Sequence, residues 1–193
     1  MAKEITVAVP DGKSAEWVNG VLTLVDEKKK DDRPVTERIK TFEDAVAELG
    51  EDHPLVQTYN AYMNEVNGIV DGDEDVVSIL QLRIITAALN EGWIPSFDKS
   101  GDEYRYSPWF ELYTQEEIDK MDEEKKRELN LCVVGGYAAG GLICGLAAVG
   151  SSGAFSASSA SSGSRLAYKS YDLALYSGRQ FTKIWMPVVF KAK

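Results

Sequence analysis

DEDVVSILQLRIITAALNEG, residues 73–92, is the stretch that decides the fold. Acidic residues open it, which suits the positive end of a helix, and Gly92 can close it. Its apolar positions form two stripes at helical spacing: Val77, Leu80, Ile84 and Ala88, and then Leu82, Ile85 and Leu89. A helix that is apolar on two faces is normally buried on both. The pattern therefore predicts a central helix around which a main domain packs.

Two shorter helices are predicted on the N-terminal side of this central helix. The stretch TFEDAVAELG, residues 41–50, starts with a capping-box pattern and ends in glycine. The next helix is expected to begin near Asp52 and to run to about Val66, because Pro54 is tolerated in a first turn.

The first 26 residues are typical of a small β unit. KEITVAV, residues 3–9, alternates apolar and polar side chains as a strand does. Asn19-Gly20 lies between two apolar runs, which is the usual sign of a tight hairpin. The charged stretch EKKKDDRP, residues 27–34, is the best candidate for a boundary. We therefore expect an N-terminal β unit at 1–40, serving attachment or oligomerisation, and a main domain at 41–193.

An aromatic stretch, WIPSFDKSGDEYRYSPWFELYT, follows the central helix at residues 93–114. Glycine, proline, serine and aspartate punctuate it, so turns and short extended pieces are predicted. Its rings could form a ligand platform, but a core role with one or two rings exposed is favoured. TQEEIDKMDEEKKREL, residues 114–129, then predicts one exposed helix, with a capping box and acid-before-base pairs four residues apart.

The chain carries no charged residue between Leu129 and Ser164. Residues 131–150 are long enough for a transmembrane helix, but six glycines in these 20 residues disfavour one. The helix predicted from SYDLALYSGRQFTKIW, residues 170–185, must dock its apolar face on the same domain. The small-residue stretch before it is therefore a connection anchored at both ends, built of short strands and turns.

The fold class that follows is α+β. It consists of an N-terminal β-hairpin unit, a helical middle, and a Gly/Ser-rich region of short strands closed by a C-terminal helix. Between residues 135 and 164, 23 of 30 residues are Gly, Ala or Ser, a uniformity that composition alone does not explain.

Several function classes find no support in the sequence. The net charge of −10 argues against nucleic-acid binding. His53 is the single histidine and is expected at the surface or as a helix cap. DGDED at 71–75 lacks the glycine and glutamate of a calcium loop, and GGYAAGG at 135–141 lacks the lysine of a phosphate loop. We expect that the protein is not an enzyme, and we identify no catalytic residue, cofactor or metal ligand in its sequence.

The two cysteines, Cys132 and Cys144, are too few for a disulfide framework. The two cysteines could form a single disulfide or stay as two buried thiols, and buried thiols are favoured. The N-terminus MAKEITVAVPDG has no long apolar core, so we expect no secretory signal peptide. We expect the protein to be synthesised in a bacterial cytoplasm.

Three blocks of sequence carry a family resemblance: ALNEGW at 88–93, YRYSPWF at 104–110 and SRLAYKSYDLALYSGRQF at 164–181. With them, most of residues 41–185 resembles a group of uncharacterised phage and prophage proteins of gut Bacteroides-type bacteria. In such proteins the segment before the SRLAYKS-like block is often variable. This segment resembles the variable regions of proteins that diversity-generating retroelements target. Such target proteins commonly carry a C-type-lectin-like fold.

The resemblance implies a ligand-display surface at residues 135–164. The candidate display positions are Tyr137, Ala138, Ala139, Leu142, Ser151, Ser152, Ala154, Phe155, Ser156, Ser158, Ser159, Ser161 and Ser162.

The leading hypothesis is a virion-associated phage protein that binds a host surface receptor, either a protein or a glycan, through a surface that is variable or fixed. The alternative is a structural decoration protein of a capsid or tail, whose small side chains pack against other virion proteins. A third hypothesis is membrane insertion through residues 131–150. Self-association into a homo-oligomer is left open.

Overall fold

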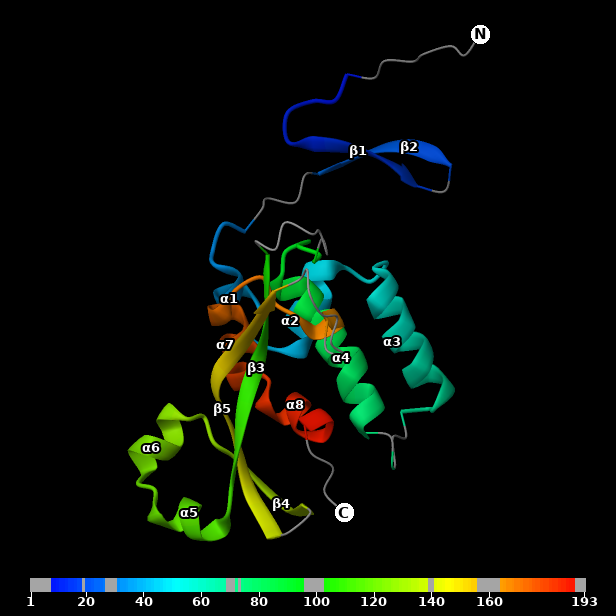
Figure 1. The fold of residues 1–193 in the computed structure, drawn as a ribbon. Coiled ribbons are helices and arrows are strands. Elements are labelled where there is room, and N and C mark those ends of the chain that lie inside the picture. Colours follow the sequence, from blue (N-terminus) through cyan, green and yellow to red (C-terminus); the bar gives the residue numbers. More distant parts are fainter. Residues whose placement is uncertain are drawn as a thin grey trace. The chain divides into compact units, whose positions relative to one another are not determined.

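The computed structural model describes residues 8–18, 20–26, 31–68, 72, 74–95, 103–138, 141–155 and 164–189. These residues form eight α-helices, one 3-10 helix and two small antiparallel sheets, which confirms the predicted α+β class (Figure 1). The chain divides into two compact units, Met1–Arg33 and Pro34–Lys193.

The N-terminal unit contains the predicted hairpin. Strands β1 (Lys13–Val18) and β2 (Val21–Asp26) pair antiparallel, and Gly20 takes the left-handed conformation (φ +80°) that a two-residue turn requires. The strand predicted at 3–9 falls largely outside the described residues, and residues 8–10 are not in a strand.

The division between the units lies at Arg33/Pro34, ahead of the predicted boundary at 40/41. Helix α1 (Val35–Arg38) and Ile39 belong to the second unit, because Ile39 is fully buried in its core and Val35 packs against that core. The charged stretch 27–34 ends at this division.

Three helices form the middle of the second unit: α2 (Phe42–Leu49), α3 (Pro54–Glu65) and α4 (Glu74–Leu89). Thr41 and Asp44 make the predicted capping box, in which backbone N–H groups at residues 40 and 41 hold the pKa of the Asp44 carboxyl below its usual range. The predicted start of α3 at Asp52 is wrong, because His53 occupies the N-cap and Pro54 begins the helix.

Helix α4 is the central helix that the sequence predicts. Ile84 and Ala88 of one predicted stripe and Leu82, Ile85 and Leu89 of the other are buried, whereas Val77 and Leu80 near the start of the helix are half-buried. The helix contacts α2, α3, α7 and α8.

The second unit contains one three-stranded sheet in the order β3-β5-β4. Its strands are β3 (Tyr104–Tyr113), β4 (Cys132–Ala138) and β5 (Gly141–Phe155). The prediction of turns and short extended pieces across the aromatic stretch is wrong for residues 104–113, which form one ten-residue strand. Pro108 is tolerated there because β3 is an edge strand, where a missing N–H need not break a ladder on both sides.

Between β3 and β4 the predicted single helix is broken into α5 (Gln115–Lys120) and α6 (Glu123–Glu128). The break occurs because Asp122 serves as a new N-cap and accepts a hydrogen bond from the Lys125 N–H at 2.7 Å. The predicted capping box at Thr114 and the Glu116–Lys120 ion pair at 2.6 Å are both confirmed.

After β5 the chain continues through the short 3-10 helix η1 (Ser164–Leu166) into α7 (Tyr171–Gln180) and α8 (Thr182–Val189). The predicted single helix is interrupted at Phe181, which lets Phe181 and Trp185 both enter the core. Its predicted docking is confirmed, because α7 packs on β3 and β5 while α8 packs on α4 (Figure 1).

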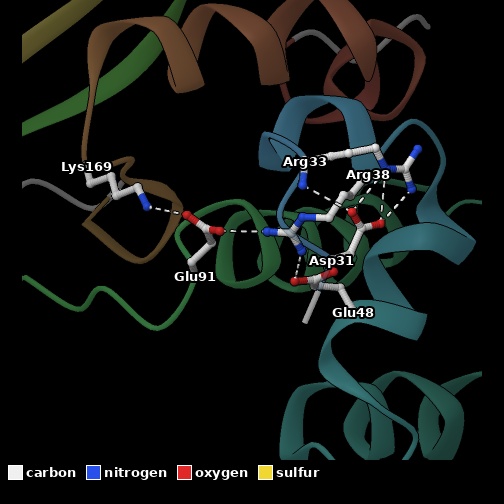
Figure 2. A network of polar contacts seen from close by, with 6 residues as sticks. All are labelled: Asp31, Arg33, Arg38, Glu48, Glu91 and Lys169. Carbon is white, nitrogen blue, oxygen red and sulfur yellow. Dashed lines mark hydrogen bonds and ion pairs between the residues drawn. The ribbon is translucent and has the colours of Figure 1, made fainter. Parts of the chain in front are cut away.

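A network of ion pairs links distant segments of the second unit (Figure 2). Arg38 pairs with Glu48 of α2 and, at 2.6 Å, with Glu91 after α4. Glu91 also pairs with Lys169 at 2.9 Å, so α1, α2 and the end of α4 are tied to the segment before α7. In the N-terminal unit, Asp31 and Arg33 pair with each other at 2.6 Å.

Among the described helices, none combines the length and the apolar character needed to cross a bilayer. The described part of 131–150 forms strands β4 and β5, so the transmembrane helix considered for this segment is not formed.

Candidate binding surface

One face of the sheet is closed by helix α7 at very short range. A Cβ atom placed on Gly178 would lie 2.7 Å from Ala148 Cβ and 2.9 Å from Pro108 Cβ, closer than such atoms approach each other. Phe110, on the same face of β3 as Pro108, contacts the Trp185 ring at a centroid distance of 5.7 Å. This face is therefore part of the protein core.

The opposite face is also covered near the start of β5. A Cβ atom on Gly145 would lie 2.8 Å from Ile118 Cδ1 of α5. All residues from Gly145 to Ala148 are buried, although successive residues of a strand point to opposite faces. In this part of β5, small side chains thus admit helices on both sides.

Further along β3, the face away from α7 carries an exposed indole. Trp109 is 60% exposed at the centre of the strand, and it alternates with half-buried Ser107 and exposed Glu111. In β5, Ser152 is paired directly opposite Ser107. We call the set of three residues Ser107, Trp109 and Glu111 of β3 the open face.

The Glu111 carboxylate of the open face is held by a neighbour on the same strand. Tyr113 donates its hydroxyl hydrogen to Glu111 Oε2 at 2.7 Å. Burial, followed by this hydrogen bond, raises the pKa of Tyr113 to about 12, so the hydroxyl keeps its proton at neutral pH. The carboxylate retains free acceptor positions for a ligand, since each of its oxygens can accept more than one hydrogen bond.

The predicted display positions that the structure describes lie in strands β4 and β5. In the register of β5 with β3, Ser151 and Ser152 pair with Pro108 and Ser107, and Ala154 and Phe155 pair with Arg105 and Tyr104. The positions at the β4–β5 end are Tyr137, Ala138 and Leu142. The remaining positions, Ala139, Ser156, Ser158, Ser159, Ser161 and Ser162, lie outside the described residues.

The open face was missed by the sequence reasoning, which placed turns in this stretch. The signal that could have found it is the alternation in YRYSPWFELY, residues 104–113, where every second residue from Arg105 onward belongs to the face away from α7. Proline and serine in the middle of the stretch obscured that alternation.

The far side of the Gly/Ser-rich segment is anchored at Tyr168, which is fully buried. Its backbone forms two hydrogen bonds with Tyr106 of β3, at 3.1 and 2.8 Å. Its hydroxyl lies 2.9 Å from Thr86 Oγ1 and 2.6 Å from Ser177 Oγ, and Ser177 also accepts a hydrogen bond from the Trp185 indole N–H at 3.1 Å. Burial raises the pKa of the Tyr168 hydroxyl to about 12.

Asn90 provides a second anchor for the same segment. Its Nδ2 donates to the carbonyl of Ala167 at 2.9 Å, and its Oδ1 accepts from the N–H of Lys169 at 3.1 Å. Asn90, Tyr106 and Tyr168 belong to the three sequence blocks at 88–93, 104–110 and 164–181. These blocks therefore meet at one structural junction.

The residues considered for chemistry lie apart from one another. His53 is a helix cap, as predicted, because its Nδ1 accepts a hydrogen bond from the Leu55 N–H at 3.2 Å. Cys132 is a free, half-buried thiol whose pKa is raised by burial, which keeps it protonated. No metal-binding cluster of His, Cys, Asp and Glu occurs in the described ranges, and Asp71 and Asp73 of the DGDED stretch lie outside them.

Comparisons of the chain with protein-family models, with curated proteins and with solved structures found no match, so the functional argument depends on the geometry described above.

Proposed function

We propose that this protein is a binding protein that recognises a cell-surface glycan through the open face. The observation that carries the proposal is the exposure of Trp109, at 60%, on a strand whose other face is packed into the core. Such a ring gains free energy when a partner removes it from water, and aromatic side chains of this kind are enriched where ligands and proteins bind.

The polar neighbours of Trp109 fit a sugar. An indole face accommodates the C–H face of a pyranose ring, while sugar hydroxyls need acceptors beside it. Glu111 supplies a carboxylate and Ser107 a hydroxyl on the same side of β3. The β5 residue paired with Trp109 is Gly150, which has no side chain.

The resemblance to phage proteins supplies the biological setting of the proposal: the ligand is a host surface glycan and the protein is carried on a virion. A C-type-lectin-like display of variable residues is part of the same proposal. Variation at Ser152, which pairs with Ser107 of the open face, would alter the surface that the ligand meets. Variation at buried Leu146 and Ala148 would not be tolerated. Sequences of close copies should therefore differ after residue 150 and agree at 145–148.

Glycan binding can be tested with fluorescently labelled protein on a glycan array and on whole bacterial cells. Trp109→Ala should abolish binding while leaving the thermal unfolding curve nearly unchanged. Trp17→Ala is the matched control, because Trp17 is also largely exposed to solvent (73%) but lies in the N-terminal hairpin. Undiminished binding by the Trp109 variant would exclude the open face.

A structural role in the virion is the second candidate function, and the N-terminal hairpin favours it. Trp17, Val21, Leu22 and Leu24 are all exposed on two strands, and a lone two-stranded hairpin is only marginally stable in water. A partner that covers these side chains would stabilise it. Light scattering after size exclusion, and co-sedimentation with purified virions, should both respond to Trp17→Ser and not to Trp109→Ala if this role holds.

A further inference from the structure

A pocket of about 440 Å³ lies in the second unit, at the N-terminus of α3, along α4 and beside η1. Its lining does not include the open face. We propose that this pocket binds a small organic anion, with the carboxylate or phosphate group held by Arg83 and Arg165 and an apolar body placed against Trp93.

The two arginines are the first step of the argument. Arg83 comes from α4 and Arg165 from η1, and both line the pocket. Within the described part of the chain, neither forms an ion pair or a hydrogen bond, whereas Arg38 is paired with two glutamates. Two cationic side chains that line one pocket give it a positive potential, which favours an anionic ligand.

The charge of the pocket lining favours an anionic ligand over a neutral or cationic one. The chain has 31 acidic and 21 basic residues, yet none of the pocket-lining residues that belong to the described part of the chain is acidic. An ordinary surface position in such a chain would place a carboxylate near each arginine. Guanidinium groups also match carboxylate and phosphate oxygens in a two-pronged geometry, which a lysine cannot offer.

The remaining polar groups of the lining define which donors a ligand would meet. Thr86 and Asn90 already use their side chains at the Tyr168 junction. The His53 ring accepts at Nδ1 from the helix backbone, which leaves Nε2 as its N–H donor. The charged groups among the described lining residues are therefore both cationic, Arg83 and Arg165, and the His53 N–H adds a donor.

The apolar part of the lining favours a ligand with a flat or aliphatic body. Trp93 is half buried, Ile94 is strongly exposed, and Leu55 lies at the start of α3. The volume falls in the lower part of the range of roughly 300–1,000 Å³ that is typical of small-molecule pockets. A single ring or short chain bearing one anionic group fits both features.

The pocket also touches the junction that anchors the Gly/Ser-rich segment. Asn90 and Ala167 line it, and they are hydrogen-bonded to each other at 2.9 Å. A ligand that binds the folded state should therefore raise the unfolding temperature, because binding to the native state alone stabilises it.

Four probes separate the two parts of the proposed ligand, and each is titrated into the full-length protein by calorimetry and thermal shift. Phenyl phosphate and benzoate carry both an anion and a ring, inorganic phosphate carries the anion alone, and benzyl alcohol carries the ring alone. We expect phenyl phosphate or benzoate to bind at least tenfold more tightly than inorganic phosphate or benzyl alcohol. Their order of affinity assigns the anion as a phosphate or a carboxylate.

Three single-charge variants locate the binding. Arg83→Gln and Arg165→Gln should each weaken binding of the better probe by at least tenfold. Arg127→Gln, on the exposed helix α6, is the matched control and should leave binding unchanged. Arg165 is exposed, so its variant should fold even if the Arg83 variant does not.

The proposal is overturned if no probe binds with a dissociation constant of about 1 mM or tighter, which corresponds to about −4 kcal/mol, if benzyl alcohol binds as well as benzoate, or if Arg165→Gln binds as tightly as wild type.

Discussion

Two parts of strand β5 have nearly the same composition and opposite surroundings. The covered part, Gly145–Ala148, is buried between α5 on one face and α7 on the other. The second part, Ser151–Phe155, pairs with β3 beside the open face, where Trp109 is largely exposed. Small residues in the first part let helices approach, whereas the second part pairs with the half of β3 that precedes the exposed indole.

This difference shows that a run of Gly, Ala and Ser does not by itself indicate a display surface. What decides its role is whether a partner element occupies the space that the missing side chains leave. Packing requires small residues because interiors tolerate neither voids nor overlaps. A recognition surface only allows them, so the two parts should respond to mutation very differently.

The largest contrast is expected between the two tryptophans on either side of the sheet. Trp185 is 6% exposed, and Trp185→Ala should lower the free energy of unfolding by about 3–5 kcal/mol, as other large-to-small core substitutions do. Trp109→Ala should change it by less than about 1 kcal/mol, because the ring is largely in water already. Urea denaturation followed by far-UV circular dichroism measures both. Comparable losses would mean that Trp109 is part of the core.

A second test adds volume to the two parts of β5. Ala148→Leu forces new atoms against Gly178 and Pro108, and should cost about 1–3 kcal/mol or more through overpacking. Ser152→Leu, on the side of the open face, should change stability by no more than about 0.5 kcal/mol. The same denaturation experiment applies. If Ser152→Leu proved as costly as Ala148→Leu, position 152 would have to be enclosed and the open face could not extend onto β5.

The sequence predicts the local features of this molecule well. The capping boxes at Thr41 and Thr114 and the hairpin at Asn19-Gly20 are confirmed because each depends on residues within a few positions of one another. The N-cap at Asp122 is of the same kind. The sequence pattern did not reveal this N-cap, because the same residues also fit one longer charged helix over 114–129.

The sequence does not predict features that depend on distant pairing. The length of β3 comes from its register with β5, in which Tyr104 faces Phe155, and no local pattern contains that information. Arg83 and Arg165 likewise reach one pocket only because the segment before α7 returns to α4. For the same reason, composition indicated a recognition role for the whole of 135–164 without distinguishing its two parts.

The anchor at Tyr168 provides a third test, because it holds the end of the segment that follows β5. Tyr168→Phe keeps the ring but removes the hydroxyl that contacts Thr86 and Ser177, and should cost about 1–2 kcal/mol. The effect should depend on pH. In the folded state the pKa of Tyr168 is raised to about 12, whereas an unfolded tyrosine ionises near 10. The stabilisation is therefore complete below pH 10 and is lost between pH 10 and 12.

Unfolding free energies of wild type and Tyr168→Phe measured at pH 7, 9 and 11 check this prediction. Wild type should lose more stability than the variant between pH 9 and 11, because only the wild type has this buried hydroxyl to ionise. A gap between the two proteins that is constant with pH would show that the hydroxyl reaches water.

The smallest expected effect distinguishes the two sides of the covered part. Gly178→Ala gains about 1 kcal/mol of helix propensity but places a methyl group against Ala148 Cβ and Pro108 Cβ, which cannot rotate away. We expect a net loss of about 1 kcal/mol. Gly145→Ala meets only the ends of the Ile118 and Leu131 side chains, which can change rotamer, so it should be neutral within about 0.5 kcal/mol. If Gly145→Ala lowered the free energy of unfolding more than Gly178→Ala does, α5 and not α7 would be the helix that packs more tightly and less adjustably against β5.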